Sequence, residues 1–444
     1  MTDIAELKRR ATAAIAAHRD DLVALGEDIR VHPELGYKER RTSTVVQSQF
    51  ARLGVPFEAG LAVTGVRGLL DGRAHRARVC YLGELDSVLV RDHPDADPQT
   101  GAAHACGHNA QITNLIALAM GLVESGVMAE LDGDVVLMAV PAEEYVEVEY
   151  RVGLKEAGVI EFLGGKPELV RLGAFDDVEM TLSTHQSTGG EAGVLSVGGA
   201  SNGCLVKQVA YTGRAAHAGG SPHEGINALK AAMIGLQAID ANRETFKDDD
   251  HIRVHPIITK GGELVNVVPA DVRLETYVRG ATIEAIVAAG AKVDRSLIAG
   301  AMALGAKVDV RTLPGYMPMR PSAALTALYK QNALQFIGAD AWAEPRFMAG
   351  STDMGDLSHI MPTIEANAGG ASGTGHGADY RISDRDVAYV LPAQVAACTL
   401  IDLLADGAQR AREISDGFEA PMTKDEYLAF LRSQDRLDHW QPSA

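Results

Sequence analysis

The chain has 444 residues, of which 46% are hydrophobic and 23% charged, and its formal net charge is −18. A single hydrophobic core rarely serves so long a chain, and at ~150 residues per domain the length predicts two or three domains. The acidic balance argues against a nucleic-acid partner, because phosphate backbones are bound by basic surface stripes.

The four cysteines, at positions 80, 106, 204 and 398, lack the spacing of a disulfide framework. Such cysteines are typical of reduced thiols in a cytosolic enzyme. Residues 1–30 are charged throughout and predict an amphipathic helix rather than a signal peptide, and the sequence has no run of ~18 apolar residues. We therefore expect a soluble cytoplasmic protein with no membrane partner.

Strands and helices alternate in the first half of the chain. Residues 77–85, 134–140 and 179–183 are short apolar runs of the buried-strand type, whereas 112–125 has helical apolar spacing. This alternation predicts an α/β fold with a mainly parallel sheet that helices cover on both faces.

Four ionisable side chains follow the ends of these predicted strands: Asp86, Glu143, Glu144 and His185. In open α/β sheets, ligands bind beyond the carboxyl ends of the strands. We therefore expect these side chains to share one site. One carboxylate of the Glu143–Glu144 pair could bind a metal ion while the other accepts a proton from water, although such a pair also occurs on solvated surfaces.

A thiol and an imidazole lie two residues apart in residues 104–109, where Cys106 and His108 flank Gly107. Both groups are favoured zinc ligands, and glycine permits the sharp turn that would aim them at one ion. A Cys-x-His pair alone occurs more often by chance than as a metal site, so other residues must supply the remaining ligands.

The pattern changes at about residue 198, where half-exposed strands begin. The order of elements predicts a small α+β sandwich with helices on one sheet face. We therefore predict an inserted domain at 198–313, and a catalytic metal-binding domain made of 1–197 and 314–444. The elements expected in the inserted domain are strands 205–212, 255–260, 270–278 and 308–311 and helices 227–241 and 282–304.

Eight stretches of the chain, in order, resemble a family of metal-dependent amidohydrolases and peptidases. This family includes aminoacylases, indole-acetyl-amino-acid hydrolases, carboxypeptidase G-type enzymes and aminobenzoyl-glutamate hydrolases, and the GHN and GAFDDV forms look most like the last branch. The stretches are GELDSV (83–88), HACGHN (104–109), PAEE (141–144), GAFDDVEMTLSTH (173–185), GRAAHAGGSPHEGINAL (213–229), NVVPADVRLETYVRG (266–280), STDMGDLSHIMP (351–362) and TGHG (374–377).

The resemblance implies roles for individual residues. Glu143 matches the general base, and Asp86 matches an aspartate that orients a metal ligand. The ions would be one or two divalent cations, either zinc, which the thiol favours, or manganese. The positions that match metal ligands are Cys106, His108, Glu144, His185 and His376.

The resemblance also implies a homodimer or a higher homo-oligomer, formed through the inserted lid domain, that binds a small-molecule substrate. His217 matches a histidine that reaches the neighbouring subunit's site and stabilises the developing oxyanion. Asn266 and Arg279 match residues that bind the substrate, the arginine by clamping a carboxylate.

The chain departs from the family beside the predicted metal ligands. Many relatives have a run of glycines after the glutamate pair, whereas residues 145–151 here read YVEVEYR. Gln111 and Gln186 also replace the usual residues. These changes keep the metal chemistry but alter what fits beside it, so we predict that Gln111 and Tyr145 line the substrate pocket.

Two reactions fit this sequence. In the first, a small carboxylate-bearing and aromatic substrate, an N-acyl or aroyl amino acid, is cleaved at its amide bond. In the second, water displaces ammonia from an electron-poor aromatic amine, as in the nitroanthranilate aminohydrolases that resemble this family. A non-catalytic metal or ligand binder is a third reading, which the presence of both a base and the full ligand set disfavours. The sequence identifies neither the substrate nor the metal.

Overall fold

The computed structural model describes residues 3–188 and 193–443. The chain forms two compact units, each made of several segments. The first unit comprises residues 1–199, 320–347 and 356–423, and the second comprises 200–319, 348–355 and 424–444.

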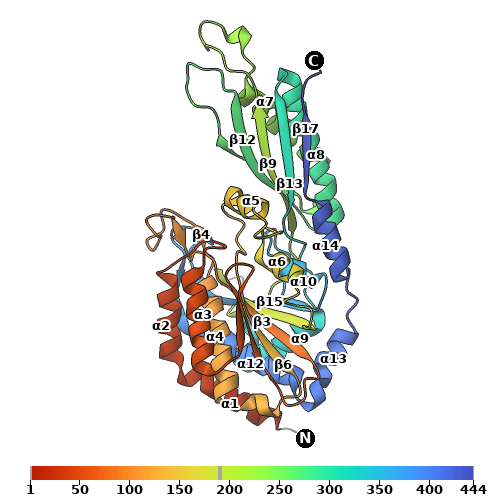
Figure 1. Ribbon diagram of the computed structural model, residues 1–444. Coiled ribbons are helices and arrows are strands. Elements are labelled where there is room, and N and C mark those ends of the chain that lie inside the picture. Colours follow the sequence, from red (N-terminus) through yellow and green to blue (C-terminus); the bar gives the residue numbers. More distant parts are fainter. Residues whose placement is uncertain (1–2, 189–192, 444) are drawn as a thin grey trace. The chain divides into compact units, whose positions relative to one another are not determined.

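Among the described residues, the first unit contains a nine-stranded sheet in the order β1-β2-β6-β3-β7-β15-β8-β14, with β16 beside β15 (Figure 1). The central strands β6, β3, β7 and β15 run parallel, which confirms the predicted mainly parallel α/β sheet. The strands are β1 (Phe57–Leu61), β2 (Gly65–Leu70), β3 (Arg78–Glu84), β6 (Asp134–Val140), β7 (Met180–Thr188), β8 (Leu195–Val197), β14 (Trp342–Ala343), β15 (Thr363–Ser372) and β16 (Arg381–Ile382), and β4 (Val88–Leu89) pairs separately with β5 (Ala102–Ala103).

Helices surround this sheet and bury it. The central helix α4 contacts β3, β6 and β7, and α1, α2, α3 and α12 pack around it. The helices outside the second unit's sheet are α1 (Ile4–Ala17), α2 (Arg19–Arg30), α3 (Arg40–Leu53), α4 (His108–Glu124), α5 (Val148–Glu156), α6 (Gly165–Arg171), α9 (Ala323–Ala333), α10 (Met354–Ser358), α11 (Arg385–Tyr389), α12 (Leu391–Leu404) and α13 (Gln409–Asp416).

The entry to α4 depends on Gly107. This residue has φ of 92°, a left-handed conformation that glycine adopts without steric cost. A Cβ at this position would lie 2.5 Å from Tyr380 Oη and 2.7 Å from Gln186 Cβ. The turn therefore requires glycine, and it places His108 at the first position of a helix that is buried along its next turns.

The span Arg385–Leu404 is long and apolar enough to cross a membrane by length and composition alone. Most of it is buried inside the first unit, where α12 contacts α1, α4 and α9. Its apolar composition therefore reflects the burial of a core helix.

The second unit is built on an antiparallel sheet in the order β10-β12-β9-β13-β17, with β11 beside β12. Helices α7 and α8 pack against each other and on this sheet. Burial alternates along β12, as expected of a strand with one covered face. The elements are β9 (Gly203–Thr212), α7 (Ala228–Asn242), β10 (Arg253–Val254), β11 (Ile257–Lys260), β12 (Asp271–Gly280), α8 (Ile283–Leu304), β13 (Lys307–Pro314), α14 (Lys424–Ser433) and β17 (Arg436–Trp440).

The C-terminal residues differ from the prediction, which placed them in the catalytic domain. In the structure β17 pairs with the outer edge of β13, whose backbone groups would otherwise lack a strand partner. Arg436 Nη2 also lies 2.7 Å from Asp294 Oδ2, and Lys207 Nζ lies 2.6 Å from Asp294 Oδ1. Residues 424–443 therefore belong to the second unit, as do 314–319 and 348–355, which were also predicted to lie in the catalytic domain.

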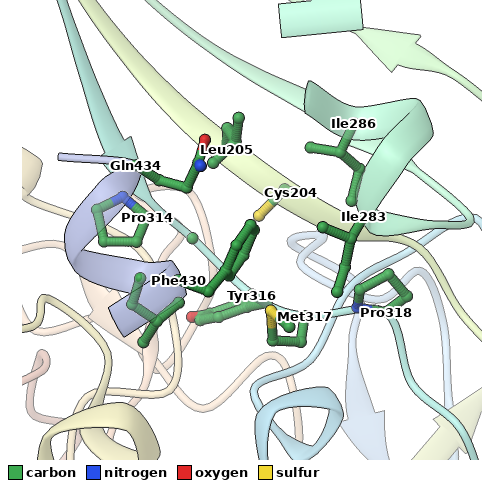
Figure 2. A pocket seen from close by; sticks show the side chains of 12 residues that line it. Cys204, Leu205, Ile283, Ile286, Pro314, Tyr316, Met317, Pro318, Phe430 and Gln434 are labelled. Carbon is green, nitrogen blue, oxygen red and sulfur yellow. The ribbon is translucent and has the colours of Figure 1, made fainter. Parts of the chain in front are cut away.

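A small apolar pocket lies within the second unit (Figure 2). Side chains from β9, α8 and α14 line it, among them Cys204, Ile286 and Phe430. Of the described residues that line it, none is a predicted site residue, so this pocket reflects the packing of α14 within its unit.

Candidate functional site

The five predicted metal ligands all lie in the first unit, near the carboxyl ends of its parallel strands. Cys106 ends the loop before α4, and His108 begins that helix. Glu144 follows β6, and His376 lies between β15 and β16. His185 was expected just after a strand, but β7 continues to Thr188, so this histidine lies within the strand.

The ligand atoms form two groups of three that share Cys106. One group is Cys106, His108 and His185, and the other is Cys106, Glu144 and His376; within each group the atoms lie within 4.8 Å of one another. The thiol Sγ is 3.2 Å from His185 Nε2 and 3.3 Å from His376 Nε2. These separations approach the ~3.5 Å expected between sulfur and nitrogen ligands around one tetrahedral ion. The residues of these two groups could therefore hold one or two divalent cations.

Buried donor atoms support this fit. The buried atoms His108 Nε2 and Glu144 Oε1 form no well-directed hydrogen bond among the described residues, although Glu84 Oε2 and His376 Nε2 each lie 3.1 Å from one of them. A buried polar atom without such a bond is costly, and a cation would satisfy both. The set of one thiol, three imidazoles and one carboxylate suits a divalent transition metal.

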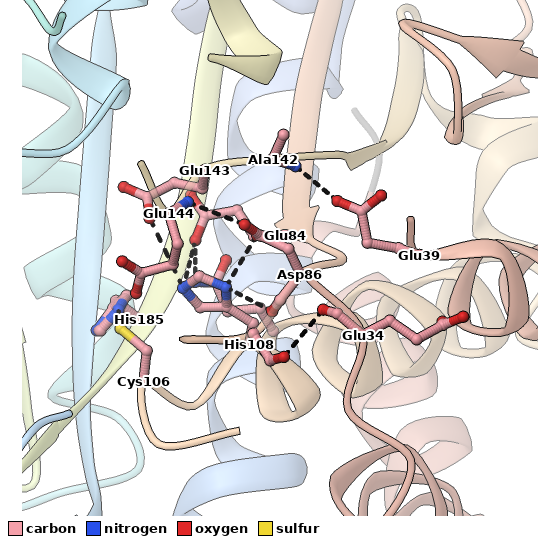
Figure 3. Close-up of polar contacts among 12 residues, drawn as sticks. Glu34, Glu39, Glu84, Asp86, Cys106, His108, Ala142, Glu143, Glu144 and His185 are labelled. Atoms are coloured by element: carbon pink, nitrogen blue, oxygen red, sulfur yellow. Dashed lines mark hydrogen bonds and ion pairs between the residues drawn. The ribbon is translucent and has the colours of Figure 1, made fainter. Parts of the chain in front are cut away.

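Asp86 orients ligands of both groups (Figure 3). His108 Nδ1 lies 2.9 Å from the Asp86 backbone oxygen and 3.3 Å from Oδ1, so the imidazole donates its proton there and turns Nε2 toward the site. The backbone N–H of Glu144 donates to Asp86 Oδ2 at 2.9 Å. These contacts agree with the orienting position predicted for Asp86.

Sequence reasoning did not identify Glu84 or Lys166, which lie beside His108. Glu84 Oε2 is 3.1 Å from His108 Nε2, and Lys166 Nζ is 2.6 Å from Glu84 Oε1. Burial alone would raise the pKa of Glu84, but Lys166 and the site histidines lower it to about 2. The acidic residue inside the apolar run of β3 was a signal for Glu84, whereas nothing in the local pattern indicated Lys166.

The structure gives Gln111 and Tyr145 contacts other than the predicted ones. The Gln111 amide is buried and donates to Glu84 Oε2 at 2.6 Å, so this side chain supports the site rather than lining an open pocket. Tyr145 is also buried, with its ring 5.6 Å from the Arg151 guanidinium. The sequence did not reveal these buried partners, and the substrate-binding roles of Gln111 and Tyr145 stay predictions.

Glu143 lies beside the cluster but in neither of the groups that contain Cys106. Its Oε2 is 4.0 Å from His108 Nε2, and its side chain keeps 10% of its surface exposed. The neighbouring Glu144 carboxyl would have a raised pKa from burial, but His376 and His108 lower it to about 2. Glu144 thus lies among the ligand atoms that share Cys106, whereas Glu143 forms a separate group of possible ligand atoms with Glu84 and His108.

The remaining predicted residues lie in the second unit. His217 Nδ1 accepts the backbone N–H groups of Gly219 and Gly220 at 3.2 and 2.9 Å, so Nε2 carries the proton and can donate. The backbone oxygen of Asn266 accepts the Ala218 N–H at 2.9 Å, which brings these two loops together.

Arg279 lies on β12 in the same unit, with its guanidinium 5.4 Å from the Tyr277 ring. Its Nη1 donates to Ser351 Oγ at 2.9 Å. A hydroxyl beside a guanidinium is a suitable second donor for a carboxylate. Sequence reasoning did not identify Ser351, although it lies in a family-like stretch.

Comparison with known proteins identifies the family to which this chain belongs. The model of peptidase family M20/M25/M40 matches residues 82–398. The mouse Xaa-Arg dipeptidase is 30% identical over 385 residues, which cover 81% of this chain and 78% of that protein. The chain belongs to peptidase family M20/M25/M40. The resemblance seen in the sequence is therefore confirmed, and this protein is a hydrolase that acts on amide or peptide C–N bonds.

Further comparisons extend the likeness. The IAA-amino acid hydrolase ILR1-like 2 of Arabidopsis thaliana is 26% identical over 354 residues, covering 77% of this chain and 75% of that one. A solved aminobenzoyl-glutamate utilization protein from Klebsiella pneumoniae superposes with a TM-score of 0.65 at 20% identity, over 91% of this chain and all of that one. The Bacillus subtilis YXEP protein, described as a dinuclear metal binding peptidase, gives a TM-score of 0.64 at 18% identity over 88% and 99% of the two chains.

Replacing Lys166 with methionine should destabilise this M20/M25/M40 protein by about 3–5 kcal/mol at neutral pH, because the buried Glu84 would lose its cation. The folded chain holds the pKa of Glu84 below its ordinary value of 4.5, so the pair stabilises the fold above that pH and the contribution is lost as the pH falls toward 2. The gap in unfolding free energy between wild type and variant should therefore shrink on acidification.

Urea unfolding of the metal-free protein at several pH values measures this gap. Lys230→Met, which changes an exposed lysine on α7, is the control and should stay within about 0.5 kcal/mol of wild type. A gap that is absent at neutral pH, or that widens in acid, would contradict this account of Glu84.

Proposed function

We propose that this protein is a metal-dependent amidohydrolase that releases an amino acid from a small N-acyl or aroyl amino acid. The observation that carries the proposal is the pair of three-atom ligand groups sharing Cys106, with Glu143 beside them. The relatives named as a dipeptidase and as an amino acid conjugate hydrolase support the substrate class.

The proposed centre holds one or two divalent cations, zinc or manganese. When bound, such ions lower the pKa of water from ~15.7 toward ~7. Cys106 favours zinc because its thiolate is soft, while the imidazole and carboxylate ligands are also compatible with manganese. The dinuclear description of the Bacillus subtilis protein supports two ions.

Glu143 is the proposed general base. Its carboxylate takes the proton of the attacking water and then delivers it to the departing nitrogen. Glu144 stays among the ligand atoms, where its N–H is held by Asp86. In this proposal the two adjacent glutamates have different roles: Glu143 transfers the proton, and Glu144 binds the ion.

Residues of the second unit complete the proposed mechanism. The protonated Nε2 of His217 donates to the oxygen that becomes negative as water attacks. Arg279 and Asn266 bind the substrate, the arginine through its carboxylate.

We further propose that two copies pair through the second unit. Apolar side chains are exposed on its edge strand β11 and the following loop: Ile257 is 61% exposed, Leu264 63%, and Val265 fully exposed. Exposed apolar groups beside an unpaired strand edge favour association with another chain. A homodimer would let His217 act in the partner's site. The cytoplasmic location stays a prediction.

A second candidate reaction is hydrolytic removal of ammonia from an electron-poor aromatic amine. The bulky segment after Glu144 supports it, because the Tyr145 ring and the Arg151 guanidinium pack where many relatives have glycine. The same base and cations would serve, since negative charge accumulates on the attacked ring. A non-catalytic binder is disfavoured, because the base and the complete ligand set are present together.

Substrate assays separate these reactions. The purified, metal-loaded protein should release the amino acid from aroyl-glutamate or acyl-amino acid substrates, measured by chromatography. It should release no ammonia from nitro-substituted aminobenzoates in a coupled ammonia assay. Ammonia release combined with inactivity on every amide would replace the proposal with the second candidate.

Glu143→Gln should retain the bound metal and lower kcat by about 10²–10⁴-fold, because the amide cannot accept the proton of water. Metal content by elemental analysis and turnover on the best amide substrate measure the two effects. Glu149→Gln, an exposed position on α5, is the matched control and should keep full turnover. Unchanged turnover in Glu143→Gln would refute the role of this residue as base.

His217→Ala should abolish most turnover without changing the metal content, because the residue is not among the ligand atoms. Mixing it with Glu143→Gln should restore about one quarter of wild-type activity, since half of randomly paired dimers contain one intact site. Activity after co-refolding or subunit exchange measures the rescue, and each variant alone is the control. Rescue that fails although mixed dimers form would show that His217 does not act across subunits.

A further inference from the structure

Arg151 is a fully buried arginine on α5, the helix that follows the glutamate pair. Its Nη1 donates to the backbone oxygens of Leu163 at 2.8 Å and Ala142 at 3.2 Å. Its Nη2 donates to the backbone oxygen of Glu144. The guanidinium therefore contacts the loop that carries Glu143 on both sides of that residue.

This loop has a backbone that its sequence does not favour. Ala142 has φ of 54° and Glu147 has φ of 51°, both in the left-handed region that favours glycine. Such conformations persist where the surroundings fix them. The loop is therefore held in place by its contacts rather than by its own preference.

Four backbone groups around Glu143 have partners that account for this shape. The N–H of Ala142 donates to a Glu39 carboxylate oxygen at 2.8 Å, and the N–H of Glu144 donates to Asp86 at 2.9 Å. The two carbonyl groups of the same residues accept from Arg151. Carboxylates thus hold the N–H groups, and one guanidinium joins the two oxygens, which also accept the backbone N–H groups of Gly165 at 3.2 Å and Val146 at 2.8 Å.

We propose that Arg151 is a positioning residue. It fixes the loop so that Glu144 faces the other predicted metal ligands while Glu143 is presented as the base. The proposal rests on the function proposed above. Lysine could not replace this group, because an ammonium lacks the planar fork that reaches three carbonyl oxygens from two nitrogens. The Tyr37 and Tyr145 rings, 5.5 and 5.6 Å away, flank the guanidinium and limit its movement.

Arg151→Met and Arg151→Lys should each lower kcat and metal affinity by about 10- to 100-fold, as expected when support for a metal ligand is removed. KM should change less than kcat, because Arg151 does not touch the substrate. Arg412→Met removes an exposed arginine on α13, away from the Glu143 loop, and should leave both quantities near wild type.

Gly36→Ala tests the same contact from another part of the chain. A Cβ at this position would lie 2.2 Å from Arg151 Nη2 and 3.0 Å from the Cα and Cβ of Ala142, so the guanidinium, which is in the closest contact, must shift. Gly153→Ala, on α5 itself, is the matched control. A Cβ at that position meets no atom within 4 Å apart from the neighbouring backbone of its own helix. Gly36→Ala should reproduce the loss of metal affinity, and Gly153→Ala should not.

Chemical rescue decides between positioning and general destabilisation. Millimolar guanidinium chloride should restore kcat and metal affinity of Arg151→Ala at least several-fold, while equal sodium chloride should not. Circular dichroism checks that each variant is folded; if Arg151→Ala does not fold, Gly36→Ala decides the question.

Two failures are distinguishable. If the wild-type protein shows no metal-dependent amide cleavage, the proposed function itself is wrong. Wild type with that activity, combined with normal metal affinity and kcat in Arg151→Met and Gly36→Ala, would overturn the role of Arg151 alone. Lost activity without guanidinium rescue and with unchanged metal affinity would also overturn it.

Discussion

One buried carboxylate, that of Asp86, connects the two halves of the ligand cluster. It holds His108, a ligand of the first group, through Nδ1, and Glu144, a ligand of the second, through its backbone N–H. Asp86 follows β3, and β3 pairs in parallel with β6, the strand that leads to Glu144. A shift in the register of these two strands would therefore displace a ligand of each group, so the sheet determines the geometry of the site.

The charges around Asp86 explain why the site suits cations. Glu84, Asp86 and Glu144 are all buried near the same histidines, and confining negative charges away from water is costly. Lys166 offsets one of them. Burial and the neighbouring Asp86 raise the pKa of Glu39 to about 7, so this carboxyl group binds a proton more readily than an exposed glutamate does. The remaining negative charge, beside a thiol and three imidazoles, is matched by divalent ions.

The sequence revealed the parts of this site that follow from local pattern. The sheet and the position of Glu144 after β6 could be predicted, because buried strands are visible as apolar runs and their ends collect polar residues. Cys106 stood out only by its spacing from His108, and the ligand roles of both residues came from the family resemblance. Lys166 and Arg151 could not be predicted, since each contacts its partner through a fold that brings distant residues together, and a buried charged side chain on a short helix looks like a solvated one. The C-terminal strand β17 was missed for a related reason: its five residues alternate in burial only because β13 offers a free edge.

The segment after the glutamate pair shows how the same chemistry can be supported by a different backbone. A run of glycines reaches left-handed conformations freely but loses much conformational entropy when it is ordered. Here Ala142 and Glu147 adopt those conformations, and a buried arginine with flanking tyrosine rings fixes the chain between them. A loop fixed in this way would present the proposed base, Glu143, with little rearrangement on substrate binding, which is the advantage of a preorganised site. The same side chains lie close to the loop of Glu143. A change in them would therefore alter both the support of the proposed base and the shape of the proposed substrate pocket.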